Sequence, residues 1–285
     1  MIFLVCVATV VFVGRVLSSY YLQLQKSLFS ISVFKIICSM VLFLVYLYLR
    51  ALSWQYVVKG FNTPISASRG FFVWFASEST RFIPGSVWSY ASRAYLSKLP
   101  KNVNLLMVPL EIILVATSTA ILSIYSVVQN ISVIPLRIIF LIIVILLSSS
   151  VLGLFFTYKK IRILIIKLLV LDVSLSDFIK AFGLQFVSWF LYGFATVLLV
   201  QNLSFAKLLL LLSAVILSWL VGYISIIPMG LGVREGVFIF LTGGLIGIPQ
   251  ATLVAVFSRV LLILVEIVNL LFWLIVRKRF SRHSQ

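Results

Sequence analysis

Long uninterrupted apolar runs are the feature that most limits what this 285-residue chain can fold into. A helix that crosses about 30 Å of hydrocarbon needs about 20 mainly apolar residues. The runs are continuous and do not alternate in polarity, which argues against the strands of a membrane β-barrel. We expect an all-α polytopic membrane protein, a single domain over residues 1–285 with about seven to eight transmembrane helices. The expected spans are Met1–Leu17, Ile31–Leu49, Leu105–Val128, Leu136–Tyr158, Phe178–Val200, Leu208–Ile227 and Ala251–Val276.

The composition excludes a soluble enzyme. Hydrophobic residues make up 63% of the chain and charged residues 10%, whereas a soluble domain is about half apolar and roughly a quarter charged. The net charge is +17, but a nucleic-acid-binding protein needs a solvated basic face, and this chain has little solvated surface. We therefore expect a membrane protein that does not bind nucleic acid. Cys6 and Cys38 lie in apolar runs, which is typical of buried small hydrophobic residues.

Two further apolar segments are interrupted. Ile65–Leu96 contains charged residues and is divided by Pro84 and Gly85, while Ile226–Ile248 is rich in glycine. Irregular backbone at membrane depth is tolerated only inside protein or beside a wet cavity. We expect both segments to be re-entrant or broken helices. Thr63 and Pro64 are typical of a helix N-terminus and predict that the first half-helix starts at Ile65.

The distribution of Lys and Arg predicts the orientation. The stretch from Arg50 to Lys101 is basic and is expected to be a loop on the cytoplasmic side, together with 159–180 and the C-terminal tail. Both termini are then cytoplasmic if the Gly-rich segment also crosses. Residues 158–180 have the pattern of a basic amphipathic helix on an anionic leaflet, and Ser174 and Asp177 begin the next span.

A charged side chain inside a membrane costs at least about 2.5–3.5 kcal/mol, so each is a functional candidate. Glu78 and Arg81 are neighbours on one helical face and are expected either to neutralise each other or to leave Arg81 for an anion. In the second case Arg81, Pro84 and Gly85 form a turn at a helix N-terminus near Ser86, which suits phosphate. Arg93 lies about two turns further along the same half-helix. The informative charges are Glu78, Arg81, Arg93, Glu111, Arg234, Glu235, Arg259 and Glu266.

The run from Pro228 to Gly236 is the most specific motif. Gly230 and Gly232 allow close approach of a ligand, Arg234 adds a second anion-binding charge, and Glu235 is a candidate counter-ion. The alternative is a kink that an Arg–Glu pair closes. The run lacks the Gly-Lys-Ser/Thr ending of a nucleotide-binding loop.

The remaining charges are expected to balance the arginines. Glu111 is expected to pair with Arg259 or Arg234, or to carry protons, and Glu266 to serve as a counter-ion. The only histidine, His283, lies in the tail. We expect no catalytic residue, metal site or cofactor, because acid–base and metal chemistry usually need several such groups together.

These motifs together resemble the lysylphosphatidylglycerol synthase transmembrane-region family, the flippase-like domain found in the multiple peptide resistance factor and as stand-alone proteins. The resemblance implies a plasma-membrane protein with re-entrant helices, related to domains that move aminoacylated phospholipid between leaflets. Many relatives have Arg directly after the glutamate matched by Glu111, where this chain has Ile112. The matching features are Arg50 with Trp54, the segment from Arg81 to Trp88 with Arg93, Glu111, the Pro228–Gly236 run and Arg259.

We therefore expect a translocase of a lipid or lipid-linked glycan, whose anionic headgroup binds the intramembrane arginines. The alternatives are an accessory scaffold of a glycan-assembly system and a membrane-embedded transferase or phosphatase acting on a polyprenyl phosphate. The expected partners are membrane lipids and glycan-assembly proteins, and a homo-oligomer is left open. The predicted headgroup site comprises Arg81, Pro84, Gly85, Arg93, Gly230, Gly232, Arg234, Glu235 and Arg259, with Glu78, Glu111 and Glu266 as coupling or counter-ion groups.

Overall fold

The structure, a computed structural model, describes residues 31–63, 65–82, 88–130, 174–225 and 227–282. Within these ranges the chain is all-helical, as the apolar runs predicted. The elements are α3 (Val33–Gly60), α4 (Ala67–Glu78), η1 (Ser79–Phe82), α5 (Trp88–Ser97), α6 (Lys101–Gln129), α9 (Leu175–Val197), α10 (Phe205–Ile224), η2 (Pro228–Gly230), α11 (Val233–Ile246) and α12 (Ile248–Arg282).

Five of these helices are long and apolar enough to cross a membrane, namely α3, α6, α9, α10 and α12. They correspond to five of the expected spans. The other two expected spans, Met1–Leu17 and Leu136–Tyr158, and most of the expected amphipathic helix 158–180 lie outside the described residues. The protein is therefore an all-α polytopic membrane protein.

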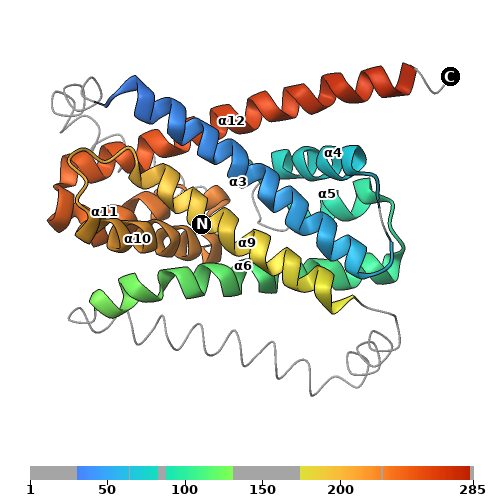
Figure 1. Cartoon of the computed structure of the whole chain (residues 1–285), viewed down its shortest axis with the longest axis horizontal. Coiled ribbons are helices and arrows are strands. Elements are labelled where there is room, and N and C mark those ends of the chain that lie inside the picture. The colour runs from blue at the N-terminus through green and yellow to red at the C-terminus, as the bar shows by residue number, and fades with distance from the viewer. Residues whose placement is uncertain (1–30, 64, 83–87, 131–173, 226, 283–285) are drawn as a thin grey trace.

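The central pair of the bundle is α3 and α9, which lie side by side in Figure 1. The helices run antiparallel, because Ser39 near the start of α3 donates to the carbonyl of Ala195 at 2.8 Å, and Ser53 near its end donates to that of Ala181 at 2.7 Å. Hydroxyl-to-backbone bonds of this kind are common between packed membrane helices. The pair provides the frame against which the shorter helices lie.

Helix α3 is longer than the sequence predicted. It continues to Gly60, whereas the apolar run ends at Leu49 and we expected a cytoplasmic loop from Arg50. That expectation was wrong at Arg50, because aromatic side chains keep this turn of the helix packed in the protein interior. Arg50 and Trp54 are buried members of α3.

Both interrupted segments are broken in the structure, and the predicted break point of the first, Pro84 and Gly85, lies outside the described residues. The first consists of α4, η1 and α5, and the second of η2 and α11. The first interrupted segment begins later than predicted, since α4 begins at Ala67 after Ser66 and not at Ile65. The hydroxyl of Thr63 instead donates to the carbonyl of Val58 at 3.2 Å, at the end of α3. The predicted start of α9 is confirmed, since the Ser174 side chain accepts from the backbone N–H of Asp177.

Candidate functional site

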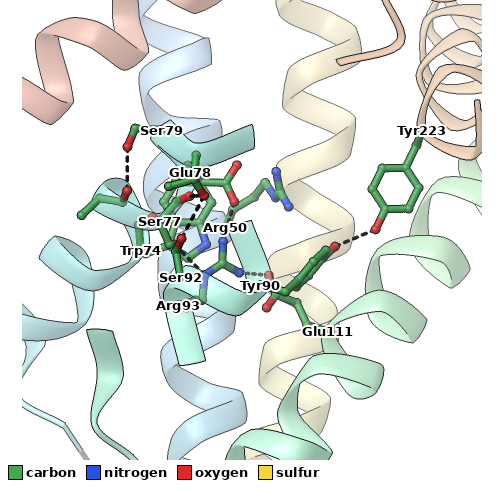
Figure 2. A network of polar contacts seen from close by, with 12 residues as sticks. Arg50, Trp74, Ser77, Glu78, Ser79, Tyr90, Ser92, Arg93, Glu111 and Tyr223 are labelled. Atoms are coloured by element: carbon green, nitrogen blue, oxygen red, sulfur yellow. Dashed lines mark hydrogen bonds and ion pairs between the residues drawn. The ribbon is translucent and has the colours of Figure 1, made fainter. Parts of the chain in front are cut away.

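Arg93 on α5 lies at the centre of a buried group of charges. Its guanidinium forms ion pairs with Glu78 at the end of α4 and with Glu111 on α6. Its Nε donates to the hydroxyl of Ser77 at 2.9 Å. Only 2% of Arg93 is exposed, so these acceptors replace the water that the guanidinium loses on burial. The cluster ties both halves of the first interrupted segment to α6 (Figure 2).

A pair of tyrosines extends this cluster to α10. The hydroxyl of Tyr90 on α5 lies 2.8 Å from that of Tyr223, near the end of α10, as Figure 2 shows. The Tyr223 ring in turn stacks on Trp219, with ring centroids 5.0 Å apart. Because α10 leads directly into the Gly-rich turn, this contact connects the two interrupted segments.

Arg259 on α12 holds the Gly-rich turn in place. Arg259 forms an ion pair with Glu235, and its Nη2 donates to the Met229 carbonyl at 2.7 Å. The second carboxylate oxygen of Glu235 accepts from the backbone N–H of Gly232 at 2.6 Å. A carboxylate in this position caps the N-terminus of α11 and complements its dipole. The Arg–Glu pair that closes the kink thus joins Arg259 of α12 to Glu235 of α11.

Arg234 lies between the Gly-rich turn and α10. Its Cζ is 5.1 Å from the centre of the Trp219 ring. The approach is close enough that a Cβ on Gly222 would lie 2.2 Å from Arg234 Cγ. Gly230 has a φ of 63°, and a Cβ there would lie 2.7 Å from the Gly222 carbonyl oxygen. Both positions therefore need glycine, for space and, at Gly230, for a left-handed backbone.

Arg50 is a buried arginine that the sequence analysis placed in a loop and left out of the predicted headgroup site. Its Cζ lies 5.7 Å from the ring centre of Tyr46, 5.5 Å from Trp74 and 5.3 Å from Trp189. The hydroxyl of Tyr46 accepts from its Nη1 at 3.2 Å. Tyr46 and Trp54 flank Arg50 at four-residue spacing, and this aromatic face was the signal that the helix continues.

Two tryptophans connect Arg50 on α3 with Arg234 in the Gly-rich segment. Trp189 on α9 makes a cation–π contact with Arg50, and Trp219 on α10 makes one with Arg234. The two tryptophan ring centroids are 4.1 Å apart. The turn η1 also packs against η2. Residues far apart in the sequence therefore meet in one polar and aromatic region inside the bundle.

Several predicted site residues are placed differently from the expectation, or not placed. The side chain of Arg81 and residues Pro84 and Gly85 lie outside the described part of the chain. Glu111 pairs with Arg93, not with the expected Arg259 or Arg234, because α5 ends shortly before α6 begins and packs against it. Glu266 lies half-buried on α12, about two turns beyond Arg259.

In the described ranges, no group of three or more His, Cys, Asp or Glu side chains is arranged to bind a metal ion. The chain was also compared with known proteins. No protein-family model, curated protein or solved structure matches it. The resemblance to the lysylphosphatidylglycerol synthase transmembrane-region family stays a prediction.

Proposed function

We propose that the protein is a flippase-like translocase that moves a lipid or lipid-linked glycan between membrane leaflets, with the anionic headgroup bound by intramembrane arginines. The proposal includes membership of the predicted family, a plasma-membrane location and both termini in the cytoplasm. The observation that carries it is that the two interrupted segments meet where η1 packs against η2, in a bundle that also buries Arg50 and Arg93. Paired interrupted helices are typical of transporter binding sites.

Two of the predicted headgroup arginines hold the interrupted segments in place. Arg93 is bonded to Glu78 and Glu111, and Arg259 to Glu235 and the backbone of the Gly-rich turn. We assign these two arginines a positioning role, because binding an anion would require them to exchange strong partners. The headgroup is assigned to Arg81 and Arg234, the arginines beside the Pro and Gly residues of the two interrupted segments, and Arg234 stacks on Trp219 close to Gly230.

The bundle surface fits acyl or isoprenoid chains. Large apolar side chains of the spanning helices are exposed, for example Phe34 on α3, Ile124 on α6 and Val268 on α12. An extensive apolar surface on spanning helices is what the hydrocarbon of a bilayer requires. A lipid headgroup that enters among the arginines would therefore keep its chains in the hydrocarbon.

A leaflet-resolved assay in proteoliposomes tests the proposal. Fluorescent phosphatidylglycerol in the outer leaflet is bleached by a membrane-impermeant reductant, so the protected fraction reports movement. The wild-type protein and Arg69→Ala, a control for an exposed arginine that donates to the Ser97 carbonyl, should move lipid at the same rate. Arg81→Ala and Arg234→Ala should be at least tenfold slower, and rates equal to wild type would contradict the proposal.

A further inference from the structure

Buried hydrogen-bond donors without an acceptor gather around Arg50, which the predicted headgroup site did not include. Among the residues that the structure describes, Arg50 has no ion-pair partner within 4.0 Å, and its buried Nε has no acceptor. The indole N–H groups of Trp74 and Trp189, whose rings flank the guanidinium, are also buried without an acceptor. Buried donors of this kind normally have a partner.

The helix register adds another donor to this group. Ser53 bonds to Ala181 and Ser39 to Ala195 across the antiparallel α3–α9 pair, so Arg50 lies across from the turn of α9 that contains Gln185. The amide nitrogen of Gln185 is buried and has no acceptor. The missing partners at Arg50, Trp74, Trp189 and Gln185 are therefore all acceptors.

Two residues of this group keep a small exposed fraction, Arg50 with 7% and Gln185 with 4%. Tyr46 and Trp74 are each 1% exposed and Trp189 is 0% exposed. The three rings are therefore buried walls beside the guanidinium. Arg50 differs in this respect from Arg93, which also lies beside the Trp74 ring but is paired with two carboxylates.

We propose that Arg50 binds the phosphate of a phosphate ester, with the N–H groups of Trp74, Trp189 and Gln185 as further donors. An oxyanion supplies acceptors alone, and the planar guanidinium fork matches two phosphate oxygens. The aromatic rings add cation–π attraction that keeps the guanidinium in place without consuming its donors. The inference rests on the proposed function for the lipid as the source of the phosphate, whereas the anion site itself rests on the donors.

Binding to the purified full chain in detergent tests the inference. The probes are a short-chain phosphatidylglycerol, a diacylglycerol of the same chain length that lacks phosphate, and inorganic phosphate, and the signal is tryptophan fluorescence. Phosphatidylglycerol should bind wild type and Arg69→Gln equally, and Arg50→Gln at least tenfold more weakly. Arg50→Lys should be intermediate, because it keeps the charge and loses the fork.

Two further variants keep the test valid if Arg50→Gln does not fold. Trp189→Phe keeps a ring and removes the N–H, and Gln185→Leu removes the amide, so each should weaken binding several-fold. If phosphatidylglycerol binds and inorganic phosphate does not, the site takes a lipid headgroup. If inorganic phosphate binds as tightly as phosphatidylglycerol, the site takes a free anion. Diacylglycerol binding as tight as that of phosphatidylglycerol, or unchanged binding in all of these variants, would overturn the inference. Binding and transport are measured in separate assays. A protein that moves no lipid in proteoliposomes can therefore still show this phosphate site.

Discussion

Arg93 on α5 and Glu111 on α6 form an ion pair inside the bundle, where Arg93 also bonds to Glu78. One guanidinium thus pairs with two carboxylates from two different helices. Removing one partner of a buried pair is strongly destabilising, by about 3–5 kcal/mol, because the other charge stays buried. The stability of the first interrupted segment should therefore depend more on Arg93 than on either glutamate.

Substitution of these residues should reveal that order. Arg93→Met leaves both carboxylates without this counter-ion, whereas Glu111→Gln leaves Arg93 paired with Glu78. Thermal unfolding in detergent should show a larger loss of stability for Arg93→Met, and the double variant Arg93→Met/Glu111→Met should recover part of it. A larger loss for Glu111→Gln than for Arg93→Met would show that the pair is not organised in this way.

Substitution by alanine should destabilise the protein at Gly230 in the Gly-rich turn and be tolerated at Gly236 in α11. Gly230→Ala would place Cβ 2.7 Å from the Gly222 carbonyl oxygen on a backbone with a φ of 63°, so the turn must move. Gly236→Ala is the matched control in α11, where a Cβ meets nothing within 4 Å, and it should leave stability unchanged or raise it slightly. The measurement is the melting temperature of each variant. An equal decrease in both would contradict the close contact between η2 and α10.

The tyrosine bridge should appear as a coupling energy. Tyr90→Phe and Tyr223→Phe each leave one hydroxyl without the bond seen at 2.8 Å, and a hydrogen bond of this kind contributes about 0.5–1.5 kcal/mol. The double variant should therefore lose less stability than the two single variants together. Unfolding free energies from a double-mutant cycle measure this directly, and strict additivity would mean that the two segments are not linked here.

Glu235 should act through two separable contacts. Glu235→Gln keeps an amide oxygen that can accept from the Gly232 N–H but loses the charge facing Arg259, and Glu235→Ala loses both. Stability should fall in the order wild type, Gln, Ala. If instead purified protein turns over a polyprenyl phosphate and Glu235→Gln abolishes only this turnover, the membrane-enzyme alternative gains support.

The sequence predicted the bundle and both helix breaks, because apolar length and the Pro and Gly interruptions are local signals. It did not predict the pairing of charges. Glu111 is separated from Arg93 by a helix end and a turn, and which arginine it meets depends on how α5 packs on α6. Arg50 was missed for a related reason: a basic residue after an apolar run is typical of a loop, and only the aromatic rings from α4 and α9 bury it.

The central claim, that the interior binds an anionic lipid headgroup, is tested most directly by native mass spectrometry of protein purified in a mild detergent. The wild-type chain should retain one phosphate-bearing lipid through a collision energy that removes loosely bound lipids. Arg50→Gln and Arg234→Ala should lose it, and Arg69→Gln should retain it. A wild-type protein that carries no phosphate-bearing lipid, or the same lipid in all four proteins, would contradict the account.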